Sequence, residues 1–317
     1  MESANATRTY WIFVAVPLAA LACFYFYPLF KVLVLSVTVP QPGFGNFDKL
    51  LSSEAIQRIL LTTLRVSLMT TLIALATGYA IAYAMLQVSP AQRTWMLFIV
   101  LLSFWLSVLV RAFAWLTLLQ SRGLINTALM GLGLISEPLP LVRNELGVVI
   151  GMVHYLIPYA VLPIFANMQG IDARLVPAAR GMGATRFQAF WRVFLPLSLP
   201  GVLSAGILLF IFSLGFYITP ALLGGGKTVM IAEYISVQVL DTLNWGGGAI
   251  LATTLLVAVI GLLALLYIRD VRKLPRADER LREAFDVDVR SQPVSPAIVA
   301  TKFFLSRVTN AVDGTSM

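Results

Sequence analysis

The sequence is poor in charge for its length. Only 12% of its 317 residues are Asp, Glu, Lys or Arg, whereas 59% are hydrophobic and the mean hydropathy is +0.85. Soluble domains carry about 25% charged residues, so this chain lacks the polar surface that a globule needs in water. The composition excludes an ordinary soluble domain and indicates one compact bundle of helices in a membrane.

Cysteine and histidine are scarcer still, because the chain holds one of each, Cys23 and His154. A single cysteine cannot form an internal disulfide, so the redox compartment stays open. The two residues also fall short of the ligand set of a protein-built zinc site. We therefore expect no metal site, and a membrane enzyme is a distant alternative because no cluster of His, Asp, Glu and Cys is discernible.

The net charge is +8 and the isoelectric point is about 9.8. A basic balance fits either nucleic acid or an anionic membrane surface. The basic residues stand in short gaps between apolar runs, which favours membrane lipid as the partner over nucleic acid.

Long apolar runs are abundant. A run of about 20 apolar residues has the length of a transmembrane helix, and a backbone in lipid must satisfy its own hydrogen bonds as a helix. The fold class we expect is therefore all-α integral membrane, with about six transmembrane helices. The predicted spans are Tyr10–Val37, Leu60–Leu86, Trp95–Leu119, Gly147–Met168, Leu199–Leu223 and Ala249–Ile268. The first run is too long for a signal-peptide core and no small-residue cleavage site follows it, so we expect it to be retained.

The distribution of positive charge predicts the orientation, since Lys and Arg mark the cytoplasmic side. The connections between spans fall into two alternating sets, of which the first carries ten basic residues and the second five. The first set is Arg8, Arg93, Arg174, Arg180, Arg186, Arg192, Arg269, Arg272, Lys273 and Arg276. The second set is Lys49, Arg58, Arg122, Arg143 and Lys227. Both termini are therefore expected to be cytoplasmic.

Three segments follow from this arrangement. Residues 1–9 form a cytoplasmic N-terminus, residues 10–273 a transmembrane domain, and residues 274–317 a cytoplasmic tail. The tail begins charged and ends in a short apolar patch, Ile298–Leu305. We expect it to be solvated and partly disordered, and an amphipathic piece lying on the membrane surface is the alternative.

The longest cytoplasmic loop spans residues 169–196. Within it, Ala179 and Gly183 are four residues apart, so on a helix they would form a small-residue stripe that another protein can approach closely. Three arginines surround this stripe and suit an acidic or phosphate-rich partner. They are Arg180, Arg186 and Arg192. A helix that packs only on its own chain is the alternative.

Two prolines follow the arginines. We expect Pro196 and Pro200 to end or kink the element before the fifth span, because proline removes a helical hydrogen bond.

The same loop resembles the EAA loop of ABC-importer permeases. The matching residues are Ala178, Ala179, Gly183, Val193, Leu195 and Pro196, with the family's spacing throughout. Pro177 stands where the family usually has glutamate. The resemblance implies that residues 10–273 are a permease domain, and that the loop is a coupling helix docking in the cleft of an ATPase subunit.

Other stretches resemble one branch of that family, the spermidine/putrescine permeases. They are Phe104–Trp115, Gly123–Asn126 and Ser213–Gly225. The resemblance implies a multi-pass protein of the bacterial inner membrane that works with a cytoplasmic ATPase dimer, a second related permease and a soluble solute-binding protein. It also implies that the chain is not an enzyme and holds no cofactor, since ATP is bound and hydrolysed by the partner.

Candidate residues for the solute path lie in the third and fifth spans. Arg111 stands about 17 residues into the third predicted span, where a charge costs about 2.5–3.5 kcal/mol on insertion scales. It is either a gate in the path or a contact to carbonyls or an acid that orients the helix. Trp105, Trp115, Phe216 and Tyr217 offer aromatic faces that attract cations, and packing or interface anchoring is their alternative role.

Two further functions stay open at this point. The importer architecture also suits another small organic solute. A secondary carrier driven by an ion gradient would need intramembrane acids or an inverted repeat, and we discern neither in the sequence.

Overall fold

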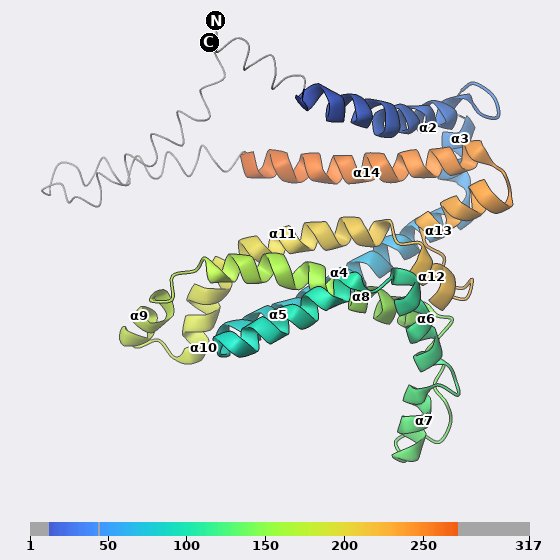
Figure 1. Ribbon diagram of the computed structural model, residues 1–317. Helices are drawn as coiled ribbons and strands as arrows, with labels where there is room; N and C mark the ends of the chain where they lie inside the picture. Colours follow the sequence, from blue (N-terminus) through green and yellow to red (C-terminus); the bar gives the residue numbers. More distant parts are fainter. Residues whose placement is uncertain (1–12, 44, 272–317) are drawn as a thin grey trace, which may run out of the picture. The chain divides into compact units, whose positions relative to one another are not determined.

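The computed structural model describes residues 13–43 and 45–271 (Figure 1), and every regular element in these residues is a helix. The predicted N-terminal segment 1–9 and tail 274–317 lie outside the described residues. The chain divides into two compact units, with the boundary after Leu256. The packing described below is that of the first unit. The second part contributes the end of the last helix, from Val257 onward.

Six helical stretches in the described residues are long and apolar enough to cross a membrane, as the sequence predicts. They are Phe13–Thr38, Glu54–Gln87, Val108–Gly131, Glu145–Gln169, Arg186–Leu214 and Trp245–Ile268. The first ends in a π-helical turn η1 (Ala22–Phe26) and α2 (Tyr27–Thr38). The second is α4 (Glu54–Gln87), the fourth is α8 (Glu145–Gln169), and the sixth begins α14 (Trp245–Val271).

The remaining helices are shorter and lie in the connections, in the third candidate span or at the start of the fifth. They are α3 (Gly45–Ser52), α5 (Pro90–Trp105), α6 (Val108–Leu119), α7 (Leu124–Gly131), α9 (Leu175–Gly181), α10 (Arg186–Ala189), α12 (Ile218–Leu223), α13 (Ile231–Ser236) and the π-helical turn η3 (Val237–Asp241).

The third predicted span, Trp95–Leu119, is wrong as a single helix. The chain breaks at Leu106, whose backbone is extended, and divides the run between α5 and α6. Ser107 caps the new helix by accepting a hydrogen bond from the Leu109 amide at 3.3 Å. The candidate span in this region is instead Val108–Gly131, made of α6 and α7.

The fifth predicted span, Leu199–Leu223, is displaced. The observed helix begins in the loop at Arg186, continues through a π-helical turn η2 (Phe190–Phe194) into α11 (Leu195–Leu214), and ends at Gly215. Pro196 does not end the helix, because it occupies the first turn of α11 directly after the π turn. A π turn shifts the hydrogen-bond register locally, and Leu195 accordingly donates to the Phe190 carbonyl.

Helices α4, α8 and α11 form the core of the part up to Leu256. The buried face of α4 is rich in small residues, and Gly78 shows why: a Cβ there would lie 2.5 Å from the Ala160 Cβ of α8. Small residues let membrane helices approach closely where lipid offers no hydrophobic drive for association. Leu156, Ile164 and Leu209 fill the space between these helices and are fully buried.

Candidate functional site

The predicted coupling loop folds as a short helix, α9, followed at Arg186 by the beginning of the fifth span. Figure 1 shows α9 and α10 together at the end of α8 from which the loop emerges. Thr185 and Gln188 form a capping box that starts α10, since each side chain meets the backbone amide of the other. The start of the second helix of the loop is therefore fixed by its own cap.

Gly183 closes α9. It lies just past the helix in the left-handed conformation, with φ of +94°, which glycine adopts without steric cost. Its amide donates to the Arg180 carbonyl at 3.0 Å, and the Ala184 amide donates to the Ala179 carbonyl at 3.1 Å. This pair of bonds is a Schellman motif. The four-residue spacing of Ala179 and Gly183 is therefore the spacing of a helix end and its cap.

The predicted small-residue stripe of Ala179 and Gly183 is wrong. Because α9 ends at Gly181, Ala179 and Gly183 do not share a helical face. Ala179 is buried at 8% exposure, whereas Ala178 is exposed. The loop instead exposes large apolar side chains, with Met182 at 84% and Phe187 at 71%.

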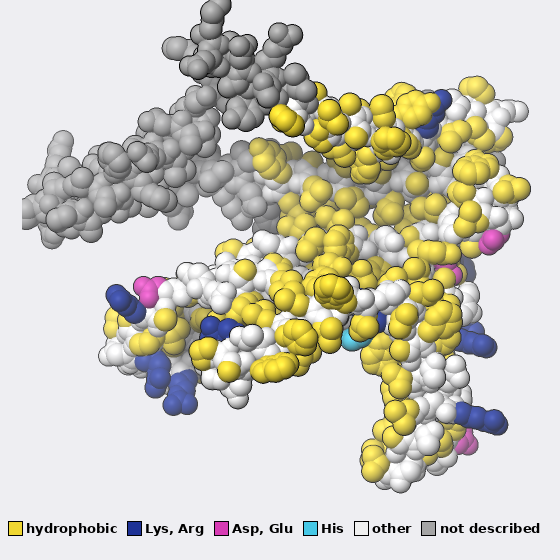
Figure 2. Space-filling view, in the orientation of Figure 1, with side chains coloured by type: hydrophobic (Ala, Val, Ile, Leu, Met, Phe, Trp, Pro, Cys, Tyr) yellow, Lys and Arg dark blue, Asp and Glu magenta, His cyan; other side chains and the backbone are white. Residues whose placement is uncertain are grey.

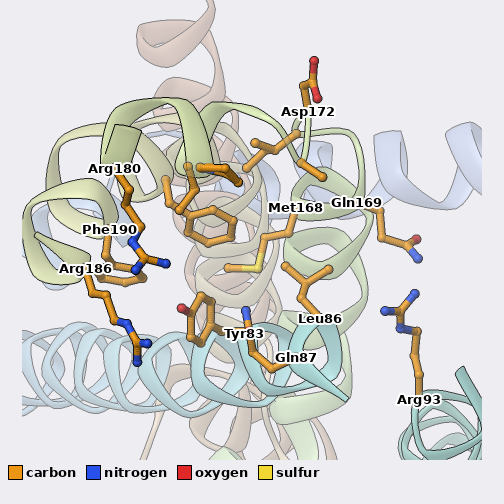
Figure 3. Close-up of a pocket in the computed structure, with 15 residues that line it drawn as sticks. Tyr83, Leu86, Gln87, Arg93, Met168, Gln169, Asp172, Arg180, Arg186 and Phe190 are labelled. Carbon is orange, nitrogen blue, oxygen red and sulfur yellow. The ribbon is translucent and has the colours of Figure 1, made fainter. Parts of the chain in front are cut away.

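The remaining loop residues lie on two sides of this segment. Val193 and Leu195 are half-buried in η2 and at the start of α11, and Pro196 is exposed. Arg180 and Arg186 line a cavity that also touches the ends of α4 and α8 (Figure 3). The two arginines thus face a space within their own chain.

Arg111 binds the broken end of α5. Its guanidinium donates to the carbonyls of Ser103 and Leu106 at 2.7 and 2.6 Å. These carbonyls belong to the last turn of a helix and have no partner within it. The contact is of the carbonyl type that stands above as the alternative to a gate. It explains how the chain can break inside an apolar run without proline or glycine.

An aromatic cluster surrounds Arg111, and sequence analysis missed most of it. The guanidinium lies 4.7 Å from the ring centre of Tyr155, which stacks on Tyr159 at 5.5 Å. Phe216 meets Tyr155 edge-on at 5.0 Å. Phe104 and Phe212 meet Tyr159 at 4.8 and 5.2 Å. The signal available in the sequence was the pair Tyr155 and Tyr159, four residues apart on one face of α8.

The other predicted path residues are dispersed. Trp115 is half-buried and meets His154 edge-on at 5.7 Å. Trp105, at the end of α5, is 88% exposed. Tyr217 is 44% exposed beside buried Phe216, at the break between α11 and α12. The structure therefore brings Arg111 and Phe216 to one tyrosine and leaves Trp105 and Tyr217 on the surface of the single chain.

One acid outside the membrane spans is held in an apolar setting. Glu233 is in the first turn of α13, and one of its carboxylate oxygens is buried without a hydrogen bond. Burial raises the pKa of this carboxyl, and a hydrogen bond from the Met230 amide opposes the rise. Sequence patterns gave no signal for this residue.

Comparison with known proteins connects these features to a family. A family model described as the inner membrane component of binding-protein-dependent transport systems matches residues 84–272. The spermidine/putrescine transport system permease protein PotB of Haemophilus influenzae is 34% identical over 222 residues, covering 70% of this chain and 77% of the relative. PotB of Escherichia coli strain K12 is 32% identical over 234 residues, covering 74% and 84%.

Solved structures share the fold. A chain of a bacterial ABC transporter that imports the acidic polysaccharide alginate superposes with a TM-score of 0.67 at 19% identity. The match covers 86% of this chain and 99% of that chain. At this identity the likeness concerns the arrangement of helices.

Proposed function

This chain belongs to the family of binding-protein-dependent transport system inner membrane components, and we propose that it imports the polyamines putrescine and spermidine. Family membership makes it a multi-pass permease of the inner membrane, the non-catalytic transmembrane component of an ABC importer. An ion-gradient carrier and a membrane enzyme are thereby set aside. The solute is the proposed part, and its support is the relatives that carry spermidine and putrescine in their names.

The partners follow from the importer type. Such a system comprises an ATPase, a partner permease and a periplasmic binding protein. We assign the ATPase dimer to the end of the protein that carries α9, and the solute-binding protein to the opposite end of the spans. The partner permease is a second, related subunit.

We propose an orientation with both termini in the cytoplasm. Figure 2 supports this with Lys and Arg side chains gathered over α9 and α10. Those of the loop are Arg174, Arg180, Arg186 and Arg192. Positive charge at one end of a membrane bundle marks its cytoplasmic side.

The observation that best supports coupling is the capped, exposed end of α9. A Schellman cap fixes the helix end, and the neighbouring Met182 and Phe187 offer apolar surface that an ATPase cleft can bury. When the ATPase dimer closes on ATP, it would push this segment. The fifth span would carry the movement directly, since its helix starts at Arg186 in the same loop.

The solute path is proposed along the aromatic residues of α5 and α6 and of the break between α11 and α12. A polyamine is a flexible cation, and aromatic faces attract cations without holding them as strongly as carboxylates would. Trp105, Trp115, Phe216 and Tyr217 are the candidates, with Arg111 at the break between α5 and α6. Selectivity would reside in the soluble receptor. If Trp105→Ala and Phe216→Ala both leave uptake unchanged, the aromatic path is wrong.

Uptake of labelled putrescine and spermidine tests the function. Deletion of the gene should lower uptake, the intact chain should restore it, and Gly183→Asp should not, provided that equal amounts reach the membrane. If deletion leaves polyamine uptake unchanged in cells without a redundant carrier, the solute is another small organic molecule and the importer assignment stands.

A further inference from the structure

A cavity of about 720 Å³ lies where α4 and α8 end. Its walls also include residues of α9, α10 and η2 (Figure 3). Aromatic rings form an apolar lining, since Tyr83 meets both Phe190 and Phe194 edge-on at 5.4 Å. Met168 of α8 closes the same side and is buried.

Three arginines line this cavity. Arg180 and Arg186 reach it from α9 and α10, and Figure 3 shows Arg93 on the other side, with Tyr83 and Met168 between them. Arg93 comes from α5, and its Nε donates to the Met85 carbonyl at 2.9 Å, which holds the side chain in place.

The positive charge of these arginines is uncompensated within the described residues. The ion pairs found there, Arg58 with Glu54 and Arg65 with Glu145, lie elsewhere. Asp172 lines the cavity, but Figure 3 shows its carboxylate directed away from the arginines. One of its oxygens accepts the Arg174 backbone amide at 2.9 Å. Positively charged arginines that lack an acidic partner beside an apolar wall favour the binding of an anion.

Geometry and position select the anion. A guanidinium is a planar fork of donors that matches a phosphate group. The cavity adjoins Gln87 and Gln169, the last residues of two membrane spans, which is where lipid headgroups lie. Basic pockets between transmembrane helices at this depth bind anionic headgroups, and the aromatic wall suits the apolar part of a lipid.

We propose that this cavity binds the headgroup of an anionic phospholipid, with Arg180 and Arg186 binding its phosphate and Arg93 adding positive charge on the opposite side. Two of these arginines belong to the coupling segment and the third to α5. The bound lipid would therefore tie the coupling segment to the helix that follows α4. The site does not depend on which solute the importer carries.

The test measures bound lipid on the complete complex, purified with its ATPase and partner permease. Native mass spectrometry compares retention of phosphatidylglycerol and phosphatidylcholine with the same acyl chains. We expect preferential retention of phosphatidylglycerol. Replacing all three arginines by Gln should weaken it at least about tenfold, since the change removes the charge-assisted contacts of Arg180 and Arg186 to phosphate and the positive charge of Arg93. Arg192→Gln is the matched control, because Arg192 is an exposed arginine of the same loop that does not line the cavity.

Arg93→Gln alone separates this site from ATPase docking, because Arg93 lies outside the coupling loop. It should lower phosphatidylglycerol retention while the ATPase still co-purifies. Equal retention of the two lipids, or unchanged retention in the triple variant, would overturn the proposal. Displacement of the lipid by millimolar inorganic phosphate would assign the site to a soluble anion. Lipid that is retained only after the ATPase has been removed from the complex would overturn the proposal and assign the arginines to a protein interface.

Discussion

Replacing Arg111 by Met should destabilise the permease, because the guanidinium binds two carbonyls at the broken end of α5. Hydrogen bonds to a charged group contribute about 1.5–3 kcal/mol each, so the two together stand for about 3–6 kcal/mol. Removing the charge returns at most about 2.5–3.5 kcal/mol, the cost at a helix centre, because Arg111 is the fourth residue of the candidate span Val108–Gly131. The carbonyl contacts win narrowly, and we expect a net loss of about 1–3 kcal/mol.

Reversible unfolding of the purified protein in mixed micelles measures this loss. Arg111→Lys should recover part of it, since an ammonium keeps the charge but lacks the planar fork that spans both carbonyls. Arg122, exposed beyond the end of α6, is the control position, and Arg122→Met should leave stability unchanged. If Arg111→Met keeps the stability of the intact protein and abolishes uptake, our account is refuted and Arg111 is a gate in the path.

Three further changes probe other parts of the chain. Gly78→Ala should destabilise the protein by about 1–3 kcal/mol by overpacking, because the new Cβ would lie 2.5 Å from the Cβ of Ala160. Adding Ala160→Gly should restore the unfolding midpoint. If the midpoint is not restored, the close contact between these two positions is wrong. Gly183→Ala should cost about 1–2 kcal/mol in the left-handed conformation and lower uptake per molecule in the membrane. Gly181→Ala should neither lower stability nor lower uptake, because a Cβ there has the same open space and the backbone φ is ordinary. Glu233 has a raised pKa, so its stabilising contribution is present below the ordinary carboxyl pKa and is lost as pH rises through the raised value. The unfolding midpoint should therefore fall as pH rises over that window. Glu233→Gln should flatten this dependence of the midpoint on pH.

The sequence was sufficient for the fold class because six long apolar runs satisfy one strong physical requirement. The span Glu145–Gln169 was predicted within two residues at each end even though it contains Pro158 and Pro163. The break at Leu106 could not be predicted in the same way, because the run there contains neither proline nor glycine. What breaks it is the combination of Ser107 as a cap and Arg111 as a partner for the freed carbonyls.

The prediction of the fifth span was wrong for the opposite reason, since here a proline is present and does not break the helix. Pro196 looked like a stop, but a proline in the first turn of a helix has no hydrogen bond to lose, and the π turn before it lets the helix continue from Arg186. The aromatic cluster around Tyr155 was also missed. Its members come from α5, α8 and the region of α11, and only the fold brings them together.

Pro177 shows how a departure from the family's usual residue can leave the loop intact. Pro177 is the third residue of α9, and the first four amides of a helix have no partner within it. A proline therefore loses no hydrogen bond there. A glutamate at that position could reach back to cap the helix start, and Arg174 at the N-cap indeed has no side-chain cap. The loop thus relies on its other end, where Gly183 and the Ala179 carbonyl close the helix and fix the surface that we assign to the ATPase.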